Sequence, residues 1–382
     1  MRVATIDRSA WRTEFPSTAD QVHMNHAGLA PLPRRVAAEI RAFADEAERI
    51  SRPIYAGWCA RAEAVRSSMA RLIGARPTEI AFVKNTAEGL SLIAAGFTWE
   101  AGDNVVAVAD EYPSNVYPWL GLARRGVETR LAARRGLRVG IDEIAAVIDA
   151  RTRVVTVSAV DWQSGFRADL AALGAFCRAH DLLFVVDGIQ AVGALRVDVA
   201  ACGIDAMAMG GHKWLLAPEG CGALFVAERV LDRLEPVLLG WKSVTNADTY
   251  LPYHFQPRPD AAKFEPGSQM HLGIRALGAA IDLLLEIGPQ VVEAAVLEIT
   301  DTLRTELAAL GASILSPRHP GEASGILTFA LGDTDRLHAA LTAAGVTCRA
   351  RMGGVRLAPH FYANDDDVAR VLAVVRAHRE RG

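Results

Sequence analysis

The chain has 382 residues, of which 51% are hydrophobic and 22% charged, and its formal net charge is −3. This length favours one large and one small domain, with enough apolar material for a sizeable core. The charge balance gives no basis for a nucleic-acid-binding or anionic-membrane surface. The first residues lack an apolar segment of signal-peptide length, and no apolar run is long enough to span a bilayer. We therefore expect a soluble, cytoplasmic protein.

Five cysteines are spread along the chain and none forms a C-x-x-C pair: Cys59, Cys177, Cys202, Cys221 and Cys348. An odd, dispersed count argues against a disulfide framework and against a zinc site. We expect each cysteine to be a small buried apolar residue, and we expect no metal site.

Apolar residues have helical spacing over residues 35–49 and 58–73, and from Ile80 onward short β-rich runs alternate with helical stretches. The predicted strands are Ile80–Val83, Val105–Val108, Val154–Val160, Leu182–Val186, Ala206–Met209 and Ala223–Val226. A crossover helix is predicted over Asp169–His180. This alternation predicts an α/β fold with a mostly parallel sheet that helices cover on both faces.

The segment from Thr249 to Pro266 contains four prolines and shows no periodicity. Such a segment is typical of a functional loop or a domain connection. A strong helical pattern follows over Met270–Ile287, and residues 295–380 alternate helix and strand again. We therefore predict an N-terminal segment at 1–15, a large domain at 16–255 and a smaller α/β C-terminal domain at 256–382.

An acid and a lysine follow two successive predicted strands. Asp187 ends the apolar run at 182–186, and Lys213 lies just past the run at 206–209, between paired glycines and Trp214. Ligands of parallel sheets bind outside the carboxyl ends of the strands. A carboxylate at such an end is costly unless it is paired, and a desolvated lysine is an activated amine. The pair favours pyridoxal phosphate (PLP), with Lys213 as its Schiff-base carrier and Asp187 on its ring nitrogen. The ordinary alternatives are a strand-end aspartate that caps a turn and a surface lysine.

Other strand ends offer further cofactor contacts. Residues 81–90 indicate a strand running into a helix, with Asn85 or Thr86 as N-cap, and the free amides there suit a phosphate. Tyr112 follows the strand at 105–108 and presents a flat ring for stacking. Gln190 lies three residues after Asp187. Taken singly, these residues also fit a capped helix, a turn tyrosine and a glutamine at a helix start.

Together these motifs resemble the class V aminotransferase family. The resemblance rests on Asp187-Gly188-Ile189-Gln190 and on Gly211-His212-Lys213-Trp214-Leu215 with Pro218 and Gly220, and it extends from Met24 to the region of Asn364. The family has the type I fold of PLP-dependent transferases and includes cysteine desulfurases, kynureninases and isopenicillin N epimerases. The resemblance implies PLP as cofactor, an amino acid as substrate and a homodimer.

The resemblance also assigns roles to individual residues. Lys213 would form the Schiff base and Asp187 would bind the ring nitrogen. The other implied cofactor contacts are Gln190 at the phenolic oxygen, Tyr112 at the ring face, Thr86, Ala87 and His212 at the phosphate, and Ser268 at the phosphate of the neighbouring subunit. Ser268 also suits the N-cap of the helix that follows it. Both roles are compatible.

Arg356 matches the arginine that holds the substrate α-carboxylate, a task that suits the guanidinium fork. Asn25, His26 and His360 are further predicted substrate contacts. His360 and Tyr362 are conceivable as a second acid on the opposite face of the substrate, although packed residues of the small domain are the more ordinary interpretation.

Two departures from cysteine desulfurases bear on the reaction. Cys348 lies eight residues before Arg356 in a segment typical of a strand, which leaves too little chain for the extended loop of a catalytic cysteine. Gly210 and Ala87 stand where desulfurases have a phosphate-binding serine and threonine. Sulfur transfer is therefore the least favoured outcome.

We expect an enzyme that transforms a small amino acid through a Lys213 aldimine and a Cα carbanion, with an aminotransferase-type reaction as the leading assignment. The enzymatic alternatives are an amino-acid epimerase and a Cβ–S lyase. A non-catalytic alternative is a PLP-binding regulator or scaffold. The substrate side chain and the pathway stay open.

Overall fold

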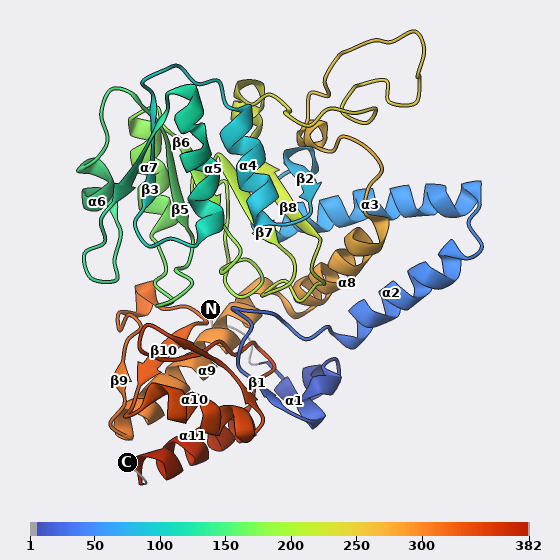
Figure 1. Ribbon diagram of the computed structural model, residues 1–382. Coiled ribbons are helices and arrows are strands. Elements are labelled where there is room, and N and C mark those ends of the chain that lie inside the picture. Colours follow the sequence, from blue (N-terminus) through green and yellow to red (C-terminus); the bar gives the residue numbers. More distant parts are fainter. Residues whose placement is uncertain (1–5, 381–382) are drawn as a thin grey trace.

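The structure is a computed structural model that describes residues 6–380 (Figure 1). A seven-stranded sheet forms the centre of the larger part, with strand order β2-β8-β7-β6-β5-β3-β4. Its strands are β2 (Ile80–Val83), β3 (Asn104–Val108), β4 (Glu128–Ala132), β5 (Thr152–Ser158), β6 (Leu183–Asp187), β7 (Ala206–Gly210) and β8 (Gly222–Val226). Only β8 runs opposite to the other strands, so β2–β8 and β7–β8 are antiparallel pairs and the remaining pairs are parallel, which confirms the predicted mostly parallel sheet.

Helices pack on the sheet and also extend away from it. The larger part contains α2 (Arg34–Ala47), α3 (Arg52–Ile73), α4 (Thr86–Gly96), α5 (Tyr117–Leu120), α6 (Ile141–Ala145), α7 (Leu170–Ala179) and α8 (His271–Ile287). Figure 1 shows α4 and α5 in front of the sheet, whereas α2, α3 and α8 run together to one side. In Figure 1 the loop between β8 and α8 extends outward above this helical arm.

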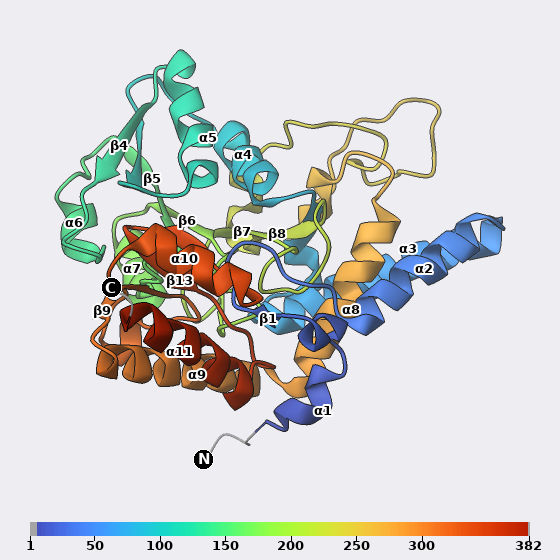
Figure 2. The same ribbon diagram turned by 60° about the horizontal axis from the view of Figure 1, so that its bottom comes forward.

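A second sheet, with strand order β12-β13-β10-β9, forms the smaller part of the molecule. Its elements are α9 (Pro289–Ala309), β9 (Ser313–Ile314), β10 (Leu327–Ala330), α10 (Thr334–Ala343), β11 (Val346–Thr347), β12 (Arg349–Arg351), β13 (Gly354–Leu357) and α11 (Asp365–Arg379). The N-terminal α1 (Arg8–Arg12) lies close by (Figure 2), and β1 (Val22–His23) pairs in parallel with β11. The N-terminal segment therefore ties the two parts together.

Two hydrophobic clusters match these two parts. The apolar residues of α8 belong to the larger cluster, and the change from one cluster to the other falls along α9, between Val296 and Ile299. The domain boundaries given above, at 15/16 and 255/256, stay a prediction.

One glycine explains how α4 reaches the site. A Cβ atom at Gly89 would lie 2.7 Å from Cβ of Ala208 on β7, a separation that real Cβ contacts do not reach. Glycine therefore lets the first turns of α4 lie directly on the sheet. As a result, the helix N-terminus is held at the edge where β6 and β7 end.

One sheet strand lacks the pattern that predicts strands. β4 is an edge strand in which only Ala132 is buried, so it has no apolar run. The antiparallel strands of the smaller part have two to four residues each, too few for a clear alternation. Within residues 6–380, no helix combines the length and the apolarity that crossing a membrane requires.

Candidate active site

Asp187 and Lys213 both lie at the carboxyl edge of the large sheet. Asp187 is the last residue of β6, and Lys213 follows β7 by three positions. Both side chains are buried. One carboxylate oxygen of Asp187 accepts the N–H of Ile189 at 2.9 Å. Among the described residues, the Lys213 amine has no hydrogen-bond or ion-pair partner, so this buried cation is left available for chemistry.

Burial shifts both of these groups toward neutrality. It raises the pKa of Asp187 to about 7 and lowers the pKa of Lys213 to about 8, and their mutual attraction opposes both shifts. The charge of Arg356 contributes to this lowering of the Lys213 pKa. An amine that loses its proton near neutral pH is suited to act as a nucleophile and as a base.

Two aromatic rings lie beside the lysine. The Lys213 amine lies 5.5 Å from the centroid of the Tyr112 ring, and Trp162 meets Tyr112 edge to face at 5.4 Å and 76°. Tyr112 is partly exposed, so one side of its ring can receive a flat ligand. The indole N–H of Trp162 is buried without an acceptor. Sequence reasoning did not select Trp162, because it lies in the loop after β5 and no motif surrounds it.

The start of α4 has the chemistry of a phosphate site. Asn85 caps the helix by accepting the N–H of Glu88 at 2.9 Å. The hydroxyl of Thr86, the first helical residue, is buried without a hydrogen-bond partner. An unpartnered buried hydroxyl is costly, and here it stands among free amides at the positive end of a helix. Thr86 and Ala87 therefore fit a phosphate group, and half-buried His212 is the residue next to Lys213.

Gln190 is fixed by two hydrogen bonds. Its amide nitrogen donates to the carbonyl of Ala27 at 3.1 Å, and its oxygen accepts the indole N–H of Trp214 at 2.9 Å. One amide hydrogen remains for another acceptor. Since Trp214 adjoins Lys213, this bond also holds the backbone that carries the lysine.

Arg356 extends from β13 of the smaller part and is buried. It donates to the carbonyl of Trp162 and, at 3.3 Å, to the side-chain oxygen of Asn25. Its Nε is buried without a partner. Burial, together with the charges of Arg351 and Arg349, lowers the pKa of Arg356 to about 10. The structure thus brings two of the predicted substrate contacts, Arg356 and Asn25, together.

His26 and His360 are fully buried, and their ring nitrogens are bonded within the protein. His26 contacts the carbonyl of Ala358 at 3.0 Å and the hydroxyl of Tyr362 at 2.9 Å. His360 donates to the carbonyl of Trp214 at 3.0 Å and accepts the next N–H in the chain at 2.9 Å. Burial lowers the pKa of both rings, that of His360 to about 4. Direct contact of either ring with a substrate would require one of these bonds to break.

Ser268 is exposed, two residues before the N-cap of α8. That N-cap is Met270, and no side chain caps the helix, so the alternative interpretation of Ser268 as its N-cap is wrong. The structure therefore leaves the Ser268 hydroxyl at the protein surface.

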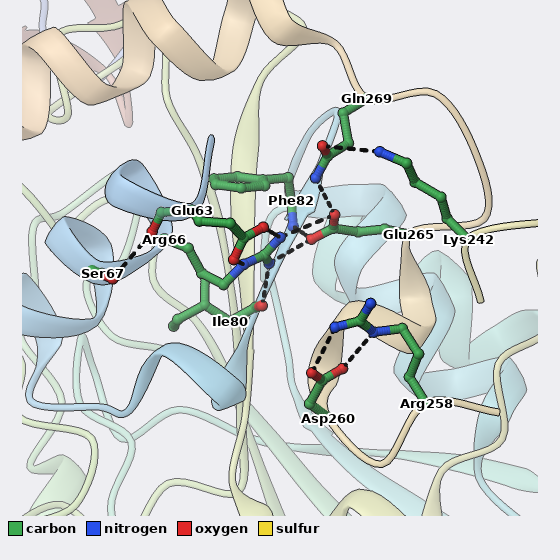
Figure 3. Close-up of polar contacts among 10 residues, drawn as sticks. All are labelled: Glu63, Arg66, Ser67, Ile80, Phe82, Lys242, Arg258, Asp260, Glu265 and Gln269. Atoms are coloured by element: carbon green, nitrogen blue, oxygen red, sulfur yellow. Dashed lines mark hydrogen bonds and ion pairs between the residues drawn. The ribbon is translucent and has the colours of Figure 1, made fainter. Parts of the chain in front are cut away.

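Hydrogen bonds anchor the segment around Ser268 (Figure 3). Glu265 accepts from Arg66 at 2.6 Å, from the N–H of Phe82 at 2.9 Å and from Gln269 at 2.6 Å. Arg66 and Glu265 are both buried, which makes this pair costly to separate. The segment that carries Ser268 is thus fixed against α3 and β2.

Glu111 is a site residue that sequence reasoning missed. It is buried and accepts the N–H of Ser158 at 2.9 Å and also its hydroxyl. Ser158 stands opposite Asp187 in the β5–β6 register. Burial raises the pKa of Glu111, and the charge of Glu111 contributes to the raised pKa of Asp187. The sequence signal that could have identified Glu111 is its position directly before Tyr112, a predicted cofactor contact.

Cys348 is buried between β11 and β12. Burial raises the pKa of its thiol to about 11, so the thiolate is scarce at neutral pH. Cys348 is the single residue between the two strands, and it packs in the core of the smaller part rather than on an extended loop.

This fold and site define a class of protein: a PLP-dependent enzyme of the type I fold, with a buried lysine and a carboxylate at the strand ends. Residues 22–371 match the family model for Aminotransferase class-V, and the chain belongs to this family. The match confirms the predicted family, with PLP as its cofactor.

Relatives and solved structures agree with this membership. The chain is 32% identical to a probable cysteine desulfurase of Methanothermobacter thermautotrophicus, over 85% of this chain and 81% of the relative. It is 30% identical to isopenicillin N epimerase of Streptomyces clavuligerus, over 99% of both chains. Its fold is similar to that of an apo cysteine desulfurase from Thermococcus onnurineus, with a TM-score of 0.89, 22% identity and 100% of both chains covered.

Proposed function

We propose that the protein is an enzyme of amino-acid metabolism that removes the Cα proton of a small amino acid, with Lys213 as the base and transamination as the reaction. The observation that carries this proposal is the buried Lys213 amine, which has no hydrogen-bond partner in residues 6–380. The charge of Asp187 raises the pKa of this amine and the charge of Arg356 lowers it. PLP, when bound, supplies the electron sink for the charge left at Cα.

The side chains divide the remaining tasks. Asp187 holds the proton of the cofactor ring nitrogen, and Arg356 together with Asn25 holds the substrate α-carboxylate. The assigned cofactor contacts are Thr86, Ala87 and His212 at the phosphate, Gln190 at the phenolic oxygen and Tyr112 at the ring face. His26 and His360 act indirectly, by holding the chain on either side of the site.

Epimerisation is less well supported, because it needs a second acid on the opposite face of the substrate. Both candidates for that acid, His360 and Tyr362, are buried and bonded to other protein groups. A Cβ–S lyase is the second candidate function, since a relative is named as a probable cysteine desulfurase. With Cys348 buried, the released sulfur would leave as a free product. Presence of Lys213, Asp187 and Arg356 together favours an enzyme over a regulator or scaffold.

We also propose a homodimer in which Ser268 reaches the neighbouring active site. Ser268 is exposed on an anchored segment, and large apolar side chains are exposed along the preceding loop, including Trp241, Tyr253 and Phe255. This loop stands away from the rest of the chain in Figure 1. A second copy of the chain would cover these side chains. The cytoplasmic location stays a prediction.

A product assay on the PLP-loaded enzyme tests the reaction. An amino-acid panel, with an α-keto acid supplied to accept the amino group, is scored for the keto acid of the donor, for pyruvate with sulfide, and for the inverted enantiomer. We expect keto acid, and we expect Lys213→Ala to abolish it. Lys213→Arg is the companion variant. It keeps a positive charge but cannot act as a neutral base near neutral pH, so we expect it to abolish the keto acid as well. An inverted enantiomer as the main product would refute the one-base proposal, and sulfide would select the lyase.

A further inference from the structure

Three arginines project from one face of the β12–β13 hairpin. In the antiparallel register Arg349 lies opposite Arg356, and Arg351 lies opposite Gly354. Residues two apart on a strand share a face of the sheet, so Arg349, Arg351 and Arg356 point the same way. The other face of the hairpin carries Val355 into the core of the smaller part.

Among residues 6–380, no acid forms an ion pair with any of these three arginines. Within residues 6–380, Arg349 and Arg351 form no ion pair, and both are exposed. Asp161, whose charge raises the pKa of Arg356, already pairs with Arg134 at 3.1 Å. Like charges directly opposite each other on paired strands are destabilising. The hairpin therefore carries a concentration of positive charge that the described residues do not balance.

The arginines border the candidate site at Trp162. The Arg351 guanidinium lies 5.5 Å from the centroid of the Trp162 ring, and Arg356 donates to the Trp162 carbonyl. Trp162 in turn packs on Tyr112, beside Lys213. The buried indole N–H of Trp162 has no acceptor within the described part of the chain. The Arg351 guanidinium, which lies over the Trp162 ring, and the unused N–H donor of that ring are together complementary to anionic oxygens.

We propose that Arg351, supported by Arg349 and the Trp162 indole, binds a second carboxylate at the end of the substrate side chain. The substrates are then dicarboxylic amino acids. This inference rests on the proposed function, in which Arg356 holds the α-carboxylate. Along β12, Arg351 lies two residues beyond Arg349, the residue opposite Arg356. At strand spacing this offset is about 7 Å along the strand. Such an offset suits a substrate with a few carbons between its two carboxylates.

The test compares acidic amino acids with neutral counterparts of similar shape. The pairs are L-glutamate with L-glutamine, L-aspartate with L-asparagine, and L-2-aminoadipate with L-norleucine. We expect kcat/KM to favour the acidic member by about tenfold or more, and Arg351→Gln or Arg349→Gln to lower that preference by about tenfold, mainly through KM. Arg124→Gln is the matched control, because Arg124 is exposed on the 3-10 helix at Gly121–Arg125.

A binding measurement that needs no turnover accompanies the kinetics. Calorimetry compares the binding of glutarate to the protein with that of butyrate; glutarate has two carboxylates and no amine. We expect glutarate to bind more tightly, and Arg351→Gln to remove the difference. Equal binding, or a glutamate preference that survives both substitutions, would overturn the inference. Turnover of neutral amino acids without any acid preference would refute the dicarboxylate inference alone, whereas lack of turnover with every amino acid would refute the proposed function.

Discussion

At the residue scale, the site is organised by the cost of burying charge. Asp187 and Lys213 lie close to the sheet edge in an environment that favours the neutral form of each. The Thr86 hydroxyl and the Trp162 N–H are likewise buried without partners. A bound cofactor and substrate would supply partners for these groups. The protein without ligands is therefore expected to be less stable than it is with them.

This view gives a pH-dependent prediction for Asp187→Asn. Burial raises the pKa of Asp187 from 3.8 to about 7, so the native state binds the proton more tightly and stability is lost as pH rises between these values. Asparagine carries no such cost. In cofactor-free protein the variant should gain about 1–3 kcal/mol in free energy of unfolding at pH 8, and nothing at pH 4. Urea denaturation at both pH values measures this. An equal effect at the two pH values would contradict the burial argument.

At the element scale, the start of α4 is the expected phosphate cradle, and Thr86→Val tests it. Loss of a hydrogen bond to a charged group should weaken PLP binding about 10- to 100-fold. Thr129→Val is the matched control, because the Thr129 hydroxyl on β4 is also buried and unpartnered but lies outside the site. Dissociation constants from absorbance titrations measure the effect. Equal weakening in both variants would show that Thr86 has no special role.

The elements also show what the sequence could predict. Asp187 and Lys213 follow apolar strands, so the apolar runs of the sequence indicate that both residues lie at the carboxyl edge of the sheet. Trp162 and Arg351 follow no such rule, because their proximity depends on how the smaller part packs against the loop after β5. The same packing gives His26 and His360 protein partners for their ring nitrogens. No pattern local to either histidine reports those partners.

At the scale of the whole molecule, the loop before α8 is the expected dimer contact. Tyr253→Asp with Phe255→Asp would place charges on two of its exposed apolar side chains. We expect this double variant to sediment as a monomer and to bind PLP more weakly, since Ser268 would no longer reach the neighbouring site. Leu131→Asp, on the edge strand β4 with 48% of the residue exposed, is the control. A double variant that stays dimeric would contradict the proposed interface.

The most direct test of the central claim is to locate the PLP linkage. The chain has four lysines, at positions 84, 213, 242 and 263. Reduction of the PLP-loaded enzyme with borohydride, followed by peptide mapping, reports which lysine carries the cofactor. We predict a pyridoxyl label on Lys213 alone and none in Lys213→Arg. A label on another lysine, or no label on loaded protein, would contradict the assignment of Lys213 as cofactor carrier and base.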